Sequence, residues 1–273
     1  MSSSSPSDRW RIAPQAKVQL TAVDPAAKDG APGDKTATKQ VSAELRVRLA
    51  DLQARLYAEG TRSVLLVLQA MDAGGKDGTI RSVFAGVNPQ GVRVASFKVP
   101  SSLERKHDFL WRVHAQTPAA GEIAVFNRSH YEDVLVTRVN DIVPETVWRA
   151  RYSHIRAFEE LLRHGDTTIV KVMLHISKDE QRQRLQARVD DPTKRWKFNA
   201  GDLDEREHWD AYQQAFQDAI TATSSSQAPW FVVPADRKWY RDWAVLSILV
   251  EALERMDPQY PPAAEGLGDT VVR

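Results

Sequence analysis

The sequence contains no cysteine among its 273 residues. This absence excludes disulfide bonds, thiolate metal sites and cysteine nucleophiles together. No apolar run approaches the length of a membrane-spanning helix, and the opening residues Met1–Pro6 lack the apolar core of a signal peptide. We therefore expect a soluble cytoplasmic protein with no membrane partner.

The chain also lacks an excess of charge of either sign, since its formal net charge is +1. Nothing global demands a nucleic-acid partner, so a site for any polyanion must come from local clustering of cations. The length is enough to bury a sizeable core as one domain with appendages.

Short apolar runs alternate with segments of helical spacing, an order that indicates an α/β fold with a parallel sheet. We expect one strand to open at Val64 and four more at 92–100, 122–126, 167–176 and 230–233. Longer helices are expected at 41–59, 144–164, 178–189, 204–222 and 237–256, and another after a capping box at Ser101. Residues 1–40 are predicted to be an irregular arm, 41–256 the domain, and 257–273 a tail. We expect that deletion of residues 1–30 leaves activity largely unchanged.

The stretch from Val64 to Thr79 organises the chain. It runs from an apolar strand through a turn with three glycines into a helical pattern. This geometry gathers free backbone N–H groups and the positive end of a helix at one point, which suits phosphate. We therefore predict phosphate contacts along the turn, at Ala73, Gly74, Gly75, Lys76, Asp77, Gly78 and Thr79.

The turn matches the P-loop pattern G-x-x-x-x-G-K-[ST] only in part. Gly75 and Lys76 fit, but Ala70 replaces the first glycine, and Asp77 stands where a metal-binding hydroxyl is expected. Thr79 is close enough in sequence to supply a hydroxyl instead. The alternative interpretation is an ordinary glycine-rich turn with a surface lysine.

Carboxylates follow two of the predicted strands, at the edge of the sheet where sites of such folds lie. Asp72 ends the first strand and can hold magnesium or orient an attacking phosphate oxygen, although it could simply form the turn. After the third strand, P-loop proteins often carry an aspartate that supports the metal, but here Asn127 is neutral. Glu132 and Asp133 could restore that carboxylate, and Arg128 could neutralise a transferring phosphoryl group. Alternatively, this segment only caps a helix.

The segment from Lys178 to Lys197 is densely charged. Arg184 and Arg188 are four residues apart, so one helix face presents both. Beyond Leu185 and Val189 this helix has little apolar surface, so it should pack lightly, as a mobile lid does. The alternative is a solvated helix face.

Several blocks of the sequence, in order and at sensible spacing, resemble the polyphosphate kinase 2 family. They are Met71–Thr79, Phe97–Pro100 with His107–Arg112, Phe126–Leu135, His175–Gln181 with Arg188 and Asp191–Lys197, and Pro234–Tyr240. The likeness covers roughly residues 40 to 256. It implies a P-loop three-layer α/β fold, with a five-stranded parallel sheet, helices on both faces and a helical lid at about 178–203.

The resemblance further implies reversible, magnesium-dependent phosphoryl transfer between inorganic polyphosphate and an adenine or guanine nucleotide, AMP or ADP included, by a homo-oligomer (tetramer or dimer). The catalytic residues would be Asp72, Lys76, Arg128, Glu132 and Arg188. Asp72 and Glu132 would hold Mg²⁺, Asn127 and Asp133 would contact the nucleotide or its phosphates, and Arg184, Arg188, Lys194 and Lys197 would grip the polyphosphate.

Two other functions remain open from the sequence. One is an ATP-dependent nucleotide kinase of the same fold, because fold alone does not separate donors. The other is a non-catalytic polyanion-binding protein that uses the basic segment. A magnesium-type carboxylate beside a glycine turn argues against the second, since a pure binder needs neither.

Overall fold

A five-stranded parallel sheet forms the centre of the protein in a computed structural model, which describes residues 5–199 and 201–263. The spatial order is β2-β3-β1-β4-β5, with every pairing parallel. The strands are β1 (Ser63–Ala70), β2 (Val92–Ser96), β3 (Ile123–Asn127), β4 (Thr167–His175) and β5 (Trp230–Pro234). All eight residues of β1 are buried, as expected for a central strand that is covered on both faces. The predicted α/β fold is confirmed.

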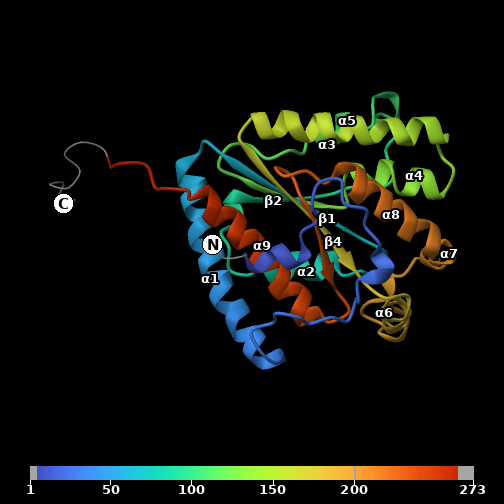
Figure 1. Cartoon of the computed structure of the whole chain (residues 1–273), viewed down its shortest axis with the longest axis horizontal. Coiled ribbons are helices and arrows are strands. Elements are labelled where there is room, and N and C mark those ends of the chain that lie inside the picture. The colour runs from blue at the N-terminus through green and yellow to red at the C-terminus, as the bar shows by residue number, and fades with distance from the viewer. Residues whose placement is uncertain (1–4, 200, 264–273) are drawn as a thin grey trace.

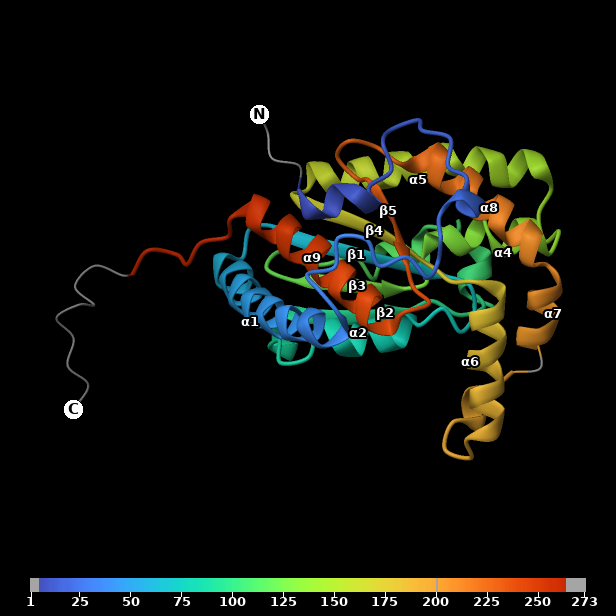
Figure 2. The ribbon, with the colours of Figure 1, turned by 60° about the horizontal axis from the view of Figure 1, so that its bottom comes forward.

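Helices cover both faces of this sheet and make three layers (Figures 1 and 2). On one face lie α1 (Lys35–Glu59), α2 (Lys76–Val83) and α9 (Lys238–Met256). On the other lie α5 (Glu145–His164) and α8 (Trp209–Thr223), beside the short helices α3 (Trp111–His114) and α4 (Val136–Val139). Two further helices, α6 (Lys178–Asp190) and α7 (Gly201–Glu207), stand at the edge where the strands end.

Several element boundaries differ from the sequence prediction. Helix α1 begins at Lys35 rather than 41, because the Asp34 carboxylate accepts the N–H groups of Thr36 and Ala37 at 2.8 and 2.9 Å. Strand β2 ends at Ser96, four residues early. The helix expected at 204–222 is two helices, α7 and α8.

The capping box at Ser101 forms, but no long helix follows it. Ser101 N–H donates to Glu104 at 2.6 Å, and Glu104 N–H donates to the Ser101 hydroxyl at 3.2 Å. Only a 3₁₀ turn at Glu104–Lys106 and the four-residue helix α3 come after it.

The N-terminal arm packs against the domain instead of lying apart from it. Trp10 is buried between Tyr240 and Trp243, with ring centroids 6.0 and 5.3 Å away in edge-on geometry. Its indole N–H donates to the Tyr240 hydroxyl at 3.2 Å, and Ile12 N–H donates to the carbonyl of Trp230 in β5 at 2.8 Å. Apart from two short 3₁₀ helices the arm is irregular from Ser5 to Asp34, but it is docked on the domain through these contacts. That activity does not need residues 1–30 stays a prediction.

At the other end of the chain, residues 257–263 of the predicted tail are non-helical, and its remainder lies outside the described residues. Within the two described ranges, no helix combines the length and the apolar character that a membrane crossing requires.

Candidate active site

An open cavity of about 1500 Å³ lies at the carboxyl ends of the strands. It is bounded by the turn after β1, the turn after β3, and helix α6 with the segment that follows it. This is the edge at which ligands bind in open parallel sheets. All of the site residues predicted from the sequence line the cavity, with the exception of Thr79.

The turn after β1 has the backbone of a phosphate-binding loop. Ala73 and Gly75 both lie in the left-handed region, at φ +57° and +104°. A Cβ on Gly74 would come within 2.5 Å of the Ala70 Cβ and 2.7 Å of the Met71 carbonyl oxygen, so glycine is required there. A Cβ on Gly75 would meet the Arg241 guanidinium at 2.1 Å.

Lys76 opens α2, and its side chain is buried beneath this loop. Its Nζ donates to the Ala70 carbonyl at 3.0 Å, so the side chain folds back over the end of β1. Burial, and after it the neighbouring Arg128 guanidinium, lowers the pKa of the Lys76 ammonium to about 8. A phosphate at this position would therefore meet a poorly solvated cation.

Thr79 is the predicted site residue that does not line the cavity. Its side chain is fully buried, and its hydroxyl donates to the Gly75 carbonyl one turn earlier in α2, at 3.2 Å. Asp77 does face the cavity, where it accepts from the Asn127 amide at 2.7 Å and lies 3.9 Å from Lys197 Nζ.

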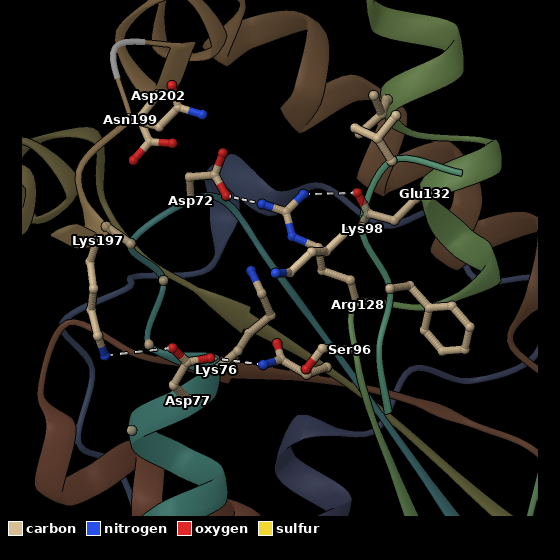
Figure 3. Close-up of a pocket in the computed structure, with 18 of the residues that line it drawn as sticks. Asp72, Lys76, Asp77, Ser96, Lys98, Arg128, Glu132, Lys197, Asn199 and Asp202 are labelled. Carbon is tan, nitrogen blue, oxygen red and sulfur yellow. Dashed lines mark hydrogen bonds and ion pairs between the residues drawn. The ribbon is translucent and has the colours of Figure 1, made fainter. Parts of the chain in front are cut away.

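Arg128 joins the two carboxylates that were predicted to hold metal (Figure 3). One end of its guanidinium contacts Asp72, and the other donates to Glu132 at 3.1 Å. Arg128 itself adopts a left-handed backbone, at φ +63°, and its N–H donates to the Leu68 carbonyl of β1 at 3.1 Å. The pKa of the Arg128 guanidinium is raised above its ordinary value. The Glu132 carboxylate is the largest cause; burial opposes it, and the Asp72 carboxylate adds to it.

Asp133 lies deeper in the same wall and is nine-tenths buried. Arg151 and Arg112 approach its two carboxylate oxygens at 3.5 and 3.9 Å, and within the described chain Oδ2 has no hydrogen-bond partner. Burial raises the pKa of the Asp133 carboxyl to about 6, against the opposing pull of Arg151 and Arg112. Apolar side chains of Phe109 and Val143 line the cavity beside it.

A buried polar network holds the turn that carries Arg128 and Glu132. Gln69 of β1 donates to the Ser129 hydroxyl at 3.0 Å, and the Tyr131 hydroxyl donates to Glu159 of α5 at 2.7 Å. Lys171 of β4 pairs with the same carboxylate at 2.6 Å. Burial opposes ionisation of Glu159, but Lys171 and His130 lower its pKa below the ordinary value.

This network was not predicted from the sequence, because its members come from four separate segments: β1, the turn after β3, α5 and β4. A lysine in the middle of a buried strand was the available signal, since a buried ammonium needs a partner. The pair stands behind the active-site turn and fixes it from below.

The predicted lid cations separate into two groups. Arg184 donates to backbone carbonyls of the phosphate loop and of the segment after β5, and its side chain is 10% exposed. It therefore does not form part of an exposed cationic row, which corrects the sequence assignment. Arg188 lies 3.4 Å from Asp202, and Lys194 lies 2.6 Å from Asp191. Lys197 reaches toward Asp77 at the loop instead of a distant surface (Figure 3).

Other lining residues were quoted in the sequence blocks but given no role. They are Lys98, His107, Arg112, Trp196 and Lys238. Arg151 and Arg241 also line the cavity but lie outside those blocks. In all, thirteen lysine and arginine side chains and nine acidic ones line the cavity, in a chain whose net charge is +1. The local excess of cations suits a polyanionic ligand.

Known proteins resemble this chain over most of its length. A model of the polyphosphate kinase 2 family matches residues 33–261. The AMP/ADP-polyphosphate phosphotransferase of Meiothermus ruber is 57% identical over 253 residues, which cover 93% of this chain and 95% of the relative. The ADP-polyphosphate phosphotransferase of Rhodopseudomonas palustris is 48% identical over 226 residues, 78% of each chain.

Among solved structures, polyphosphate kinase 2 from Arthrobacter aurescens superposes with a TM-score of 0.94 at 45% identity, covering 97% of this chain and 95% of that one. The fold, the phosphate loop and the cation-lined cavity agree with these matches. The chain belongs to the polyphosphate kinase 2 family.

Proposed function

We propose that the protein transfers phosphoryl groups reversibly between inorganic polyphosphate and a nucleotide, AMP or ADP. The names of the relatives in Meiothermus ruber and Rhodopseudomonas palustris support these substrates. The observation that carries the proposal is the cavity, in which a phosphate loop meets an excess of lysine and arginine side chains. Such a lining can neutralise a chain of phosphates as well as the two or three phosphates of a nucleotide.

Phosphoryl transfer demands mainly positioning and stabilisation of charge, and the site can provide both. The loop and the buried Lys76 ammonium hold the phosphates at the end of β1. Arg128 stabilises charge on the transferring group, because its rigid backbone and two carboxylate partners fix the guanidinium at the centre of the cavity. Arg188 faces the same space from α6.

Asp72 and Glu132 would hold Mg²⁺, which when bound neutralises phosphate charge. Both carboxylates line the same cavity, one from the turn after β1 and one from the turn after β3, on either side of Arg128. Among residues 5–199 and 201–263, no group of three His, Asp or Glu side chains could hold a metal by itself. This fits Mg²⁺, which keeps waters and binds through one or two carboxylates together with substrate phosphates.

The nucleotide lies along the wall that holds Asp133. An apolar surface that includes Phe109 and Val143 suits the base, and Arg112 and Arg151 suit its phosphate. Asp133 holds Arg151 and Arg112 in that wall, with its carboxylate oxygens 3.5 and 3.9 Å from their guanidinium groups. Adenine or guanine nucleotides, assembly as a dimer or tetramer, and a cytoplasmic location stay predictions from the sequence.

Product analysis tests this function directly. The protein is incubated with polyphosphate, Mg²⁺ and AMP, ADP, GMP or GDP in turn, and the nucleotides are separated by chromatography. We expect polyphosphate-dependent formation of the next higher phosphate, lost on addition of a chelator. Transfer from ATP without use of polyphosphate would identify a nucleotide kinase, and tight polyphosphate binding without turnover would identify a binding protein.

A further inference from the structure

The guanidinium of Arg184 is fully engaged with the protein. Its Nε donates to Glu180 at 2.7 Å, and its Nη1 donates to the carbonyls of Ala73 and Gly74 at 3.1 and 3.0 Å. Its Nη2 donates to the carbonyls of Ala235 and Asp236 at 2.6 and 3.2 Å. An arginine has five N–H donors, so none is left over for a phosphate.

Arg188, one turn further along the same helix, differs in this respect. Among the described residues, only its Nη1 forms hydrogen bonds. This nitrogen donates to the Lys197 carbonyl and to Asp202, both at 3.4 Å. Arg188 lines the cavity. Two arginines on one helix face therefore have different surroundings.

Gln181 extends the contact between α6 and the phosphate loop. Its side chain is buried, and its amide donates to the Asp72 carbonyl at 3.0 Å. Together with Arg184 it binds the carbonyls of three successive loop residues, Asp72, Ala73 and Gly74. Because a trans peptide is planar, each of these carbonyls directs the following N–H away from α6. The N–H of Gly74 donates to the Met71 carbonyl at 2.9 Å, so the amides that these contacts orient toward a ligand are those of Ala73 and Gly75.

The loop needs such partners because its backbone is strained. Ala73 has φ +57°, a conformation that costs a residue with a Cβ and persists only when its surroundings hold it. The Ala73 carbonyl is one of those that Arg184 binds. The same guanidinium ties the loop to the end of β5 through Ala235.

The distal part of the lid lacks comparable anchors. Leu185 is the last buried residue of α6, and the residues from Gln186 to Asn199 are exposed or half-buried. In Figure 2 this part of α6 projects beyond the body of the protein, whereas its first turns meet the rest of the chain.

We propose that Arg184 is a positioning residue that clamps the phosphate loop, and that the part of the lid able to move begins after Leu185. By donating to the loop carbonyls, Arg184 keeps them pointed toward α6 and so keeps the loop amides in the arrangement that binds phosphate. It does not contact the polyphosphate chain. The kinetic consequences of this inference rest on the proposed function, whereas the contacts between Arg184 and the phosphate loop do not.

Arg184→Lys tests the clamp because it keeps the positive charge. One ammonium cannot reach carbonyls of both the loop and the segment after β5, so the clamp opens. Arg182→Lys is the matched control, since Arg182 is on the same helix, 64% exposed and outside the cavity lining. Lys194→Ala/Lys197→Ala serves as the reference for loss of chain contacts. Each full-length variant is measured for turnover, for the KM of polyphosphate at low and moderate salt, and for hydrogen exchange of the loop without ligands.

We expect Arg184→Lys to lower kcat about tenfold or more, since small displacements of positioned groups cost that much. Its KM for polyphosphate and the salt dependence of that KM should stay within about twofold of the wild type, and loop exchange should accelerate. Arg182→Lys should change none of these. A weaker salt dependence with unchanged kcat and exchange would show a contact to the chain, and a wild-type profile would show no role. Either result overturns the proposal.

Gln181→Met provides a second route if Arg184→Lys does not fold. It removes the donor to Asp72 and also the acceptor of Arg206 Nη1 on α7, at 3.0 Å, but leaves Arg184 in place. Loop exchange should therefore accelerate, and kcat should fall less than in Arg184→Lys. Wild-type exchange and turnover in Gln181→Met would contradict the clamp. If the wild-type protein shows no polyphosphate-dependent turnover, the proposed function fails, and hydrogen exchange alone still decides the positioning role.

Discussion

Replacing Lys76 with methionine should make the free protein more stable while abolishing transfer. The ammonium is buried beneath the loop without a carboxylate in direct contact, and its hydrogen bond is to the neutral carbonyl of Ala70. Burial lowers its pKa from 10.5 to about 8. The protein therefore keeps a charge in an unfavourable place until a polyanion arrives.

The size of the effect follows from that shift. At 1.36 kcal/mol per pKa unit, the charged form at neutral pH costs the folded state roughly 3 kcal/mol. Methionine removes this cost but also loses the hydrogen bond to Ala70, worth about 1 kcal/mol. A net gain of about 2 kcal/mol corresponds to a rise in Tm of roughly 4–8 °C for a protein of this size.

The pH dependence has a defined sign. Because the folded pKa lies below the unfolded value, the folded state binds fewer protons between about pH 8 and 10.5, and the stability deficit of the wild type shrinks across that range. Binding of a polyanion requires the charged form. The kcat/KM of the free enzyme should therefore fall about tenfold for each pH unit above about 8.

Thermal unfolding without ligands measures the stability, and a pH profile of kcat/KM measures the titration. Lys39→Met, at an exposed position of α1, controls for the loss of one positive charge and should leave Tm unchanged. A lower Tm for Lys76→Met, or a kcat/KM that stays level from pH 7 to 9.5, would refute the reasoning.

Three further predictions concern the metal, the lid and the arm. Glu132→Gln should raise the Mg²⁺ concentration needed for half-maximal turnover, because a hard cation prefers carboxylate oxygen; an unchanged Mg²⁺ titration would reassign the metal site. Lys194→Ala/Lys197→Ala should raise the KM for polyphosphate and reduce its salt dependence while sparing nucleotide affinity; equal effects on both substrates would indicate a general closing element. Trp10→Ala should cost about 3–5 kcal/mol in thermal or denaturant unfolding because its ring is buried, and a loss below about 1 kcal/mol would show that the arm is dispensable.

The sequence predicts the sheet well because parallel strands buried on both faces leave continuous apolar runs. It also predicts which turns meet, since parallel strands end at one edge, and so Asp72, Arg128 and Glu132 are found together. The early start of α1 was missed because residues 35–40 have no apolar period. The docking of the arm was not predicted, because Trp10 is isolated in a polar segment and a single buried aromatic ring leaves no pattern.

The four-residue spacing of Arg184 and Arg188 in the sequence showed that they share a helix face. It did not show which other segments of the chain that face contacts. The carbonyls that Arg184 binds belong to segments before residue 75 and after residue 234, and no local pattern announces them. The Lys171–Glu159 pair was missed for the same reason, because it joins α5 to β4 across the body of the protein. Backbone acceptors and buried pairs are consequences of tertiary packing, so they lie beyond inference from periodicity.

Two of the departures from the usual P-loop arrangement, at Asp77 and Asn127, compensate for each other. Asp77 replaces the expected hydroxyl, and Asn127 stands where an aspartate is common, yet the Asn127 amide donates to the Asp77 carboxylate at 2.7 Å. Two aspartates at this distance would repel each other, and one would have to be protonated. With an amide at 127, Asp77 stays available to Lys197, 3.9 Å away on the lid segment. The neutral residue at 127 therefore allows a carboxylate of the phosphate loop to meet the lid segment.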